Sequence, residues 1–129
     1  MSKSIVVVVT GVSSGIGRAT AIQFAENGCR VFGTVRNTAK SQPIPGVQLI
    51  NMDIRDEASI DRGVKAIIEQ AKRIDVLVNS AGVTLLGAAE ETSIAEAKTL
   101  FDTNLFGLLR MIKAVLPHMR EQRSGRIIN

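Results

Sequence analysis

The chain has 129 residues, of which 45% are apolar and 22% are charged, and its formal net charge at pH 7 is +4. This length fits one compact domain, and this hydrophobic content excludes an intrinsically disordered chain. With no Trp, no Tyr and four Phe, the chain has few aromatic platforms for single-stranded nucleic acid, so we expect no nucleic-acid partner.

The sequence also argues against a membrane protein, a secreted protein and a metalloprotein. Its longest fully apolar run is Ile5 to Val9, whereas a membrane span needs about 20 residues and a signal-peptide core about 7 to 15. The single cysteine, Cys29, allows no internal disulfide, and the single histidine, His118, has no carboxylate at ligand spacing. We therefore expect a cytoplasmic protein with no membrane association and no metal site.

The first two predicted elements are a buried strand and a helix. Ile5 to Val9 is a continuous β-branched run, which is typical of a strand covered on both faces in a parallel sheet. Residues 15–27 follow as a helix, and Asn27-Gly28 supplies a left-handed stop. The apolar residues at helical spacing in this segment are Ile16, Ala19, Ile22 and Ala25.

Two more strands and an amphipathic helix come next. Arg30–Val35 and Val47–Met52 are predicted strands, separated by a polar, proline-containing stretch over 37–46. Residues 57–73 predict a helix with an apolar face and a charged face. The apolar face carries Ile60, Val64, Ile67, Ile68 and Ala71, and the charged face carries the i,i+4 pairs Asp61/Lys65 and Glu69/Arg73.

The last predicted elements are a fourth strand, a long helix and the start of a fifth strand. Asp75–Val78 predicts the fourth strand, and the turn Asn79-Ser80-Ala81-Gly82 follows it. Ser93, with Glu96 three residues later, resembles a capping box that opens a helix running to about Glu121. Arg126–Asn129 predicts the beginning of the fifth strand.

This alternation of strands and helices predicts an α/β fold with a doubly wound parallel sheet of Rossmann type, because parallel neighbours need right-handed crossovers. We expect the strand order 3-2-1-4-5. A ligand crevice then forms at the switch point between strands 1 and 4, outside the carboxyl ends of the strands. We interpret residues 1–129 as one dinucleotide-binding domain that breaks off at the fifth strand.

The segment TGVSSGIG, residues 10–17, closes the first strand and opens the first helix. Gly11 allows a tight turn off the strand, Gly15 allows the backbone to approach a pyrophosphate, and Gly17 allows the helix to pack close to the sheet. The helix N-terminus then presents amides to the phosphate oxygens. A tight turn without a ligand is the alternative. The residues that we expect at the pyrophosphate are Gly11, Ser13, Ser14, Gly15, Ile16 and Gly17.

Four segments of the chain match, in order, the motifs of one known family. Residues 10–17 fit TGxxxGIG at every fixed position, Asp53 follows the third strand, residues 79–82 correspond to NNAG, and Asn104 lies in the long helix. On these motifs the chain resembles the N-terminal portion of the short-chain dehydrogenase/reductase family. It departs from the pattern at Ser80, where the family usually has a second Asn.

The resemblance implies roles for several residues. Asp53 would hydrogen-bond the adenine ring, and Asn104 would be one of four catalytic residues. The others are a Ser after the fifth strand and the Tyr and Lys of a YxxxK helix, none of which this chain supplies; it contains no Tyr. The remaining residues placed at the cofactor are Ile54, Asn79, Ala81 and Gly82. As an alternative, Asp53 could cap the 57–73 helix, although Asp56 is better placed for that.

Asn104 falls on the apolar face predicted for the 93–121 helix, which consists of Ala97, Phe101, Leu105, Leu108, Ile112 and Val115. A buried amide needs hydrogen-bond partners, so a purely structural Asn bonded toward Asn79 is an alternative reading. The extra apolar residues Phe106, Leu109 and Leu116 would need a covering helix or subunit. Basic residues near the helix end, Arg110, Lys113, Arg120, Arg123 and Arg126, are interpreted as helix C-terminal charge and a solvated face.

The end of the second strand favours NADP(H) over NAD(H). Dinucleotide folds place an acid about 20 residues beyond the last glycine to bind a ribose 2′-hydroxyl, or an Arg to accept a 2′-phosphate. Here Thr34-Val35-Arg36-Asn37 carries no acid and supplies Arg36. A solvated loop charge is the alternative role for Arg36.

These features predict an NADP(H)-dependent oxidoreductase that interconverts a small-molecule carbonyl and an alcohol by hydride transfer. This chain would be its cofactor-binding portion, inactive by itself, and the full-length protein a homodimer or homotetramer. The alternatives are a non-catalytic NADP-binding sensor or interaction module, and a Rossmann-like methyltransferase. The missing acid at the second strand disfavours the methyltransferase, because adenosine hydroxyls would lack an acceptor.

Overall fold

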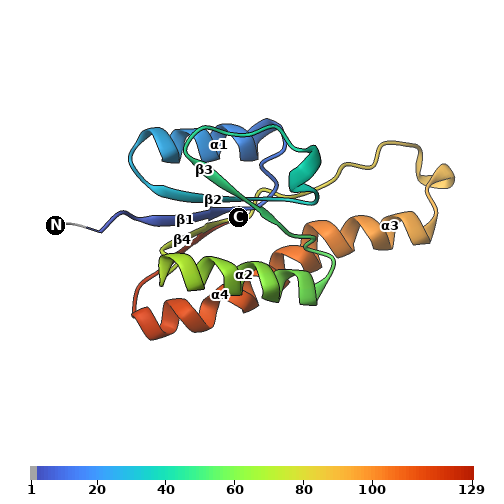
Figure 1. Cartoon of the computed structure of the whole chain (residues 1–129). Helices are drawn as coiled ribbons and strands as arrows, with labels where there is room; N and C mark the ends of the chain where they lie inside the picture. Colours follow the sequence, from blue (N-terminus) through green and yellow to red (C-terminus); the bar gives the residue numbers. More distant parts are fainter. Residues whose placement is uncertain (1–2) are drawn as a thin grey trace.

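A parallel five-stranded sheet forms the centre of the computed structural model, which describes residues 3–129 (Figure 1). The strand order is β3-β2-β1-β4-β5, as the sequence predicts, and every neighbouring pair is parallel. The strands are β1 (Val6–Val9), β2 (Arg30–Val35), β3 (Val47–Asn51), β4 (Val76–Val78) and β5 (Arg126–Ile128).

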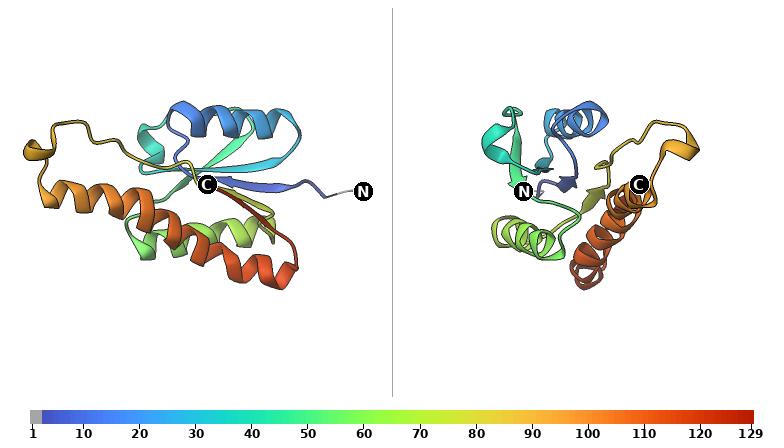
Figure 2. Two further views of the ribbon diagram at one scale, coloured as in Figure 1. Left: turned by 180° about the vertical axis from the view of Figure 1, so that it is seen from behind. Right: turned by 90° about the vertical axis from the view of Figure 1, so that its right-hand side faces the viewer.

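Helices cover both faces of this sheet. The helix α1 (Gly15–Glu26) lies on one face, and α2 (Glu57–Ala71) and α4 (Leu108–Gln122) lie side by side on the other (Figures 1 and 2). The predicted doubly wound α/β fold is therefore confirmed.

The central strand β1 contributes to two separate cores. Val6 and Val8 belong to the cluster under α2 and α4, whereas Val7 and Val9 belong to the cluster under α1. All four are almost fully buried, which explains the continuous apolar run, because side chains alternate between the two covered faces. Ile5 lies outside the strand and is 52% exposed, so the predicted strand is one residue too long.

Small residues form the buried face of α1. Gly17 and Ala21 are buried, whereas Ile16 is 81% exposed and Ala19 is exposed as well. The predicted apolar face is therefore wrong at Ile16 and Ala19, because close packing on the sheet selects residues that let the backbone approach. The helix ends as predicted, and Gly28 beyond it has a φ of +83°.

The helix α2 buries the face that the sequence predicts, including Ile60, Val64 and Ile67. Asp56 is its N-cap and accepts a hydrogen bond from the Ala58 amide. The helix ends before Lys72, which adopts the left-handed conformation with φ 66°.

Neither predicted i,i+4 ion pair of α2 forms, because Lys65 pairs with Glu69 instead of Asp61 and the helix ends before Arg73. Arg73 lies beyond the helix and pairs with Asp75 rather than with Glu69. Glu69 lies instead 3.9 Å from Lys65, one turn back in the helix. The spacing of Glu69 and Arg73 would have brought them together only if the helix had continued.

The predicted long helix consists of three parts. Ser93 and Glu96 form the expected capping box at the start of α3 (Ile94–Phe101), a π-helical turn η3 (Asp102–Gly107) follows, and α4 completes the segment. Two short 3-10 turns, η1 (Thr38–Lys40) and η2 (Ala89–Glu91), lie in connecting loops.

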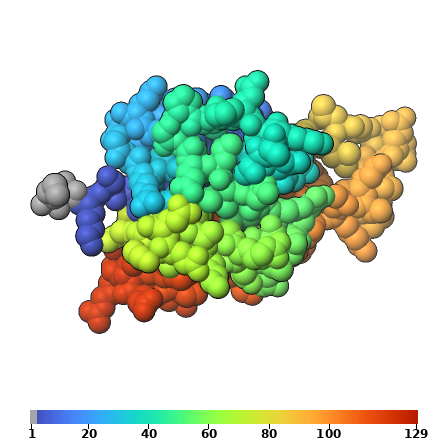
Figure 3. Space-filling view, viewed as in Figure 1, coloured from blue at the N-terminus to red at the C-terminus, as the bar shows by residue number. Residues whose placement is uncertain are grey.

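The helix α3 projects beyond the sheet (Figures 1 to 3) and buries none of its residues. In α4 the buried residues are Met111, Val115 and Met119. The apolar face predicted for this segment is therefore wrong in its first half, where Phe101 is 54% and Leu105 49% exposed. The wider π turn breaks the 3.6-residue period on which that prediction depends.

Candidate functional site

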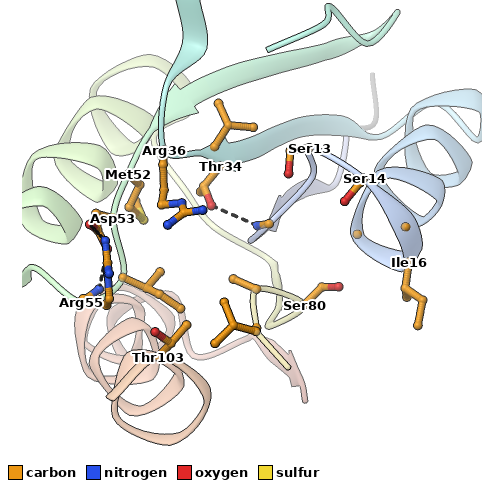
Figure 4. Close-up of a pocket in the computed structure, with 18 of the residues that line it drawn as sticks. Ser13, Ser14, Ile16, Thr34, Arg36, Met52, Asp53, Arg55, Ser80 and Thr103 are labelled. Carbon is orange, nitrogen blue, oxygen red and sulfur yellow. Dashed lines mark hydrogen bonds and ion pairs between the residues drawn. The ribbon is translucent and has the colours of Figure 1, made fainter. Parts of the chain in front are cut away.

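A cleft of about 530 Å³ opens at the carboxyl ends of the strands, next to the turn between β1 and α1 (Figure 4). This is the switch point of the sheet, where doubly wound folds bind ligands. The predicted site residues that line it are Gly11, Ser13, Ser14, Gly15, Ile16, Gly17, Arg36, Asp53, Ile54, Ala81 and Gly82. The cleft is also lined by residues that were not predicted to belong to the site: Thr34, Val35, Met52, Arg55, Ser80, Val83, Thr99 and Thr103.

The glycine loop turns sharply and packs tightly on its inner side. Gly11 has a φ of +69°, and its amide donates to Thr34 Oγ1 at 3.2 Å. A Cβ on Gly11 would lie 2.7 Å from the Ala81 Cα, and a Cβ on Gly17 would lie 2.1 Å from the Gly11 carbonyl oxygen. Neither position has space for a side chain, so both glycines are required by packing alone.

The outer side of the same loop is open. Gly15 has a φ of +58°, and a Cβ there would meet no atom within 4 Å. Ser14 is the N-cap of α1, yet its side chain makes no capping hydrogen bond. The first amides of the helix therefore face open space with the positive end of the helix dipole. This arrangement fits a pyrophosphate, for which these amides and the Ser13 and Ser14 hydroxyls are donors.

Thr10 joins the glycine loop to the turn after β4. Its side chain is almost fully buried, and its hydroxyl oxygen accepts hydrogen bonds from the amides of Ser80 and Ala81, both at 3.0 Å. This contact brings two sides of the cleft together. In the sequence Thr10 is predicted only as a position of the TGxxxGIG motif. A hydroxyl at the end of an otherwise aliphatic buried strand is the signal that could have identified this contact.

Three ionisable side chains line the far end of the cleft: Arg36, Asp53 and Arg55. The Asp53 carboxylate accepts from Arg55 Nε at 3.0 Å, Nη2 at 2.9 Å and the backbone amide at 3.0 Å. The side-chain hydrogen bond from Arg55 lowers the pKa of Asp53 most, partial burial opposes it, and the charge of Arg36 adds a further lowering.

Arg36 is exposed and extends into the cleft above this pair (Figure 4). The far end therefore holds two guanidinium groups and one carboxylate, which suits an anionic ligand. Asp53 does not cap α2, since Asp56 does. Arg55 carries no motif that could have identified it; its position next to Asp53 in the sequence was the only signal.

The two predicted asparagines lie outside the lining of the cleft. Asn104 is exposed in η3, so its predicted burial on an apolar face is wrong; its Oδ1 accepts from the Val83 amide and its Nδ2 donates to the Val83 carbonyl, both at 2.8 Å. Asn79 Nδ2 donates to Asn129 Oδ1 at 2.9 Å. Asn79 Oδ1 is buried and has no hydrogen-bond partner among the described residues.

Within residues 3–129 no three His, Cys, Asp or Glu side chains are arranged to hold a metal ion. In the same range, no helix combines the length and the apolar character that crossing a membrane requires.

Comparisons with known proteins agree with the motifs. Residues 5–129 match the short chain dehydrogenase family. The chain is 40% identical to a 3-ketodihydrosphingosine reductase of Bacteroides thetaiotaomicron, over 96% of this chain and 45% of that protein. It is 38% identical to the NADP-dependent 3-hydroxy acid dehydrogenase YdfG of Salmonella typhi, over 96% of this chain and 52% of that protein.

Solved structures give the same result. A short-chain dehydrogenase from Streptomyces avermitilis superposes with a TM-score of 0.89 at 38% identity, covering 97% of this chain and 48% of that one. ElxO with NADP bound superposes with a TM-score of 0.90 at 30% identity, covering 97% of this chain and 54% of that one.

The chain thus spans about half the length of the relatives it matches. The methyltransferase alternative is removed, and the resemblance seen in the sequence is confirmed. The chain belongs to the short chain dehydrogenase family and matches the N-terminal, cofactor-binding portion of its relatives.

Proposed function

We propose that this chain binds NADP(H) and forms the cofactor-binding portion of an oxidoreductase that interconverts a small-molecule carbonyl and an alcohol. The observation that carries the proposal is the open, uncapped N-terminus of α1 at one end of a cleft that has Arg36 at the other. A dinucleotide has negative charge at both places, on its pyrophosphate and, in NADP(H), on its 2′-phosphate. When bound, it would donate the hydride in the reduction of a carbonyl and accept it in the oxidation of an alcohol.

The preference for NADP(H) rests on charge at the far end of the cleft. Arg36 follows the last residue of β2, at the place where an acid would select the 2′-hydroxyl of NAD(H). Arg55 is already paired with Asp53, so Arg36 is the guanidinium that we assign to the 2′-phosphate. Two relatives use or bind this cofactor: YdfG is an NADP-dependent 3-hydroxy acid dehydrogenase, and ElxO has been solved with NADP bound. By the resemblance, Asp53 and Ile54 would contact the adenine, and Ala81 and Gly82 would contact the cofactor near Asn79.

A titration tests this preference. We expect the protein to bind NADPH at least about tenfold more tightly than NADH, because one charge-assisted hydrogen-bonded pair contributes about 1.5–3 kcal/mol. Arg36→Asp should reverse the order. Lys40→Asp is the matched control, since Lys40 is a neighbouring exposed cation in η1 that does not line the cleft. Equal affinity of the unmodified protein for NADH and NADPH would contradict the proposal.

Asn104 is the member of the family's catalytic set that this chain contains. In this structure its amide holds the backbone of Val83, so we assign it to positioning the chain that follows Gly82. The chain has no Tyr, which is the residue that donates the proton in the family. We therefore expect the 129-residue chain alone to bind cofactor without reducing carbonyl compounds.

We also propose a cytoplasmic homodimer or homotetramer for the full-length protein. Phe101, Leu105, Phe106 and Leu109 are each about half exposed along η3 and its flanking helices. Such a row of apolar side chains is typical of a surface that a partner covers. Light scattering checks this proposal, and a monodisperse monomer would contradict it.

A further inference from the structure

The π-helical turn η3 contacts both walls of the cleft. Toward one wall, the Asn104 side chain hydrogen-bonds both the backbone amide and the backbone carbonyl of Val83. Toward the other, Gly107 packs directly on Ile54, in the loop between β3 and α2. A Cβ on Gly107 would lie 2.7 Å from Ile54 Cδ1 and 3.2 Å from the Ile54 carbonyl oxygen. One short segment therefore joins the loop that carries Asp53 to the chain that follows Gly82.

Arg110, in the first turn of α4, fastens this segment. Its Nη1 donates to the Ile54 carbonyl at 3.1 Å and to the Asp102 carbonyl at 3.2 Å, and its Nη2 donates to Asp102 Oδ1 at 2.6 Å. The side chain is 27% exposed. The interpretation of Arg110 as a solvated helix charge is therefore wrong, because the guanidinium bridges two elements.

The shape of the guanidinium suits Arg110 to this position. In a π turn each carbonyl accepts from the amide five residues later, and such turns occur only over short stretches. Arg110 supplies donors to the Asp102 carbonyl that opens the turn, and with the same planar group to Ile54. A lysine, which is a single point charge, could not reproduce this fork.

We propose that Arg110 is a positioning residue for the cofactor cleft. By tying Asp102 to Ile54 it holds η3 in place, and η3 in turn holds Val83 through Asn104. Loss of the Arg110 guanidinium should therefore loosen a backbone segment whose residues it does not contact. The effect on cofactor affinity rests on the proposed function, whereas the effect on Val83 does not.

Two measurements on Arg110→Met test the proposal. Methionine keeps an unbranched apolar stem and removes all donors. We expect the amide of Val83, which donates to Asn104, to exchange its hydrogen about tenfold faster, since opening of the local structure becomes easier. We also expect NADPH to bind about fivefold more weakly, because the competent cleft is less populated. Arg120→Met, the same change at an exposed position of α4, should alter neither.

Unchanged Val83 exchange and unchanged NADPH affinity in Arg110→Met would overturn the proposal, even if the thermal midpoint falls. If the unmodified protein binds no NADPH, the proposed function fails, and Val83 exchange alone still decides the role of Arg110. If Arg110→Met does not fold, Asp102→Asn removes the ion pair with less disruption. It should accelerate Val83 exchange about threefold, and an unchanged rate there would overturn the proposal.

Discussion

Two glycines of the loop between β1 and α1 have opposite surroundings, so the same substitution should affect them differently. At Gly17 the added Cβ would lie 2.1 Å from the Gly11 carbonyl oxygen, which is backbone and cannot rotate away. Overpacking of this kind costs about 3 kcal/mol. At Gly15 the added Cβ would meet no atom within 4 Å. The substitution there loses stability only because alanine disfavours the left-handed φ of +58°, by about 1 kcal/mol.

The two variants should therefore separate folding from binding. With about 4 °C of thermal midpoint per kcal/mol for a chain of this size, we expect Gly17→Ala to lower the midpoint by about 12 °C and Gly15→Ala by about 4 °C. Gly15→Ala should nevertheless bind NADPH at least about tenfold more weakly, since its methyl group occupies the space that we assign to the pyrophosphate.

Thermal unfolding without ligand, followed by calorimetric titration with NADPH, measures both effects. Gly28→Ala is a matched control, because Gly28 also has a positive φ and an open surrounding, at the opposite end of α1. A Gly15→Ala protein that binds NADPH as tightly as the unmodified protein would refute the assignment of this loop to the pyrophosphate. A Gly17→Ala protein with an unchanged midpoint would refute the packing argument.

Three further outcomes are expected. Thr10→Val should lower the free energy of unfolding by about 1–3 kcal/mol in urea titrations, because two amides of the 79–82 turn lose their acceptor; Thr99→Val, at an exposed site, should change it little. Stability should fall as the pH drops below about 4. Burial raises the pKa of Asp75, but Arg73 and a backbone amide lower it more, so the folded-state pKa lies below the unfolded one. This stabilisation is complete above the pKa of Asp75 in the unfolded chain and is lost as the pH falls through its pKa in the folded protein. Asp75→Asn should therefore make the urea midpoint depend less on pH between pH 5 and pH 2. Finally, the 129-residue chain should not oxidise NADPH in the presence of aldehydes or ketones, and steady turnover would show that a group other than a tyrosine donates the proton.

Features encoded by neighbouring residues could be predicted from the sequence. The run Val6–Val9, the glycines at 11, 15 and 17 and the Ser93 capping box each depend on a few adjacent residues and on local backbone geometry. The strand order followed from them, because short crossovers and a fixed handedness leave few arrangements of five parallel strands. The position of the cleft followed from the strand order.

Features that depend on contacts between distant residues could not be predicted. Arg110 sits in a helix with other basic residues, and nothing local distinguishes it from Arg120; its partner Ile54 is on a different element. The prediction that Asn104 is buried was wrong because no local sequence pattern indicates a π turn. Within such a turn, residues depart from the 3.6-residue period on which the prediction depends. Arg73 pairs with Asp75, and not with Glu69, because α2 ends at Ala71.

The strand order also determines the order in which the strands can pair while the ribosome synthesises the chain. On one side, β1 pairs with β2, and β2 with β3, so residues 6–51 can associate early through nearby segments. On its other side, β1 pairs with β4, which begins only at Val76. Contacts between segments so far apart form slowly. Until Val76 leaves the ribosome, the edge of β1 that later pairs with β4 is unpaired and its strand is wholly aliphatic. Another nascent chain could use this edge as a template for pairing.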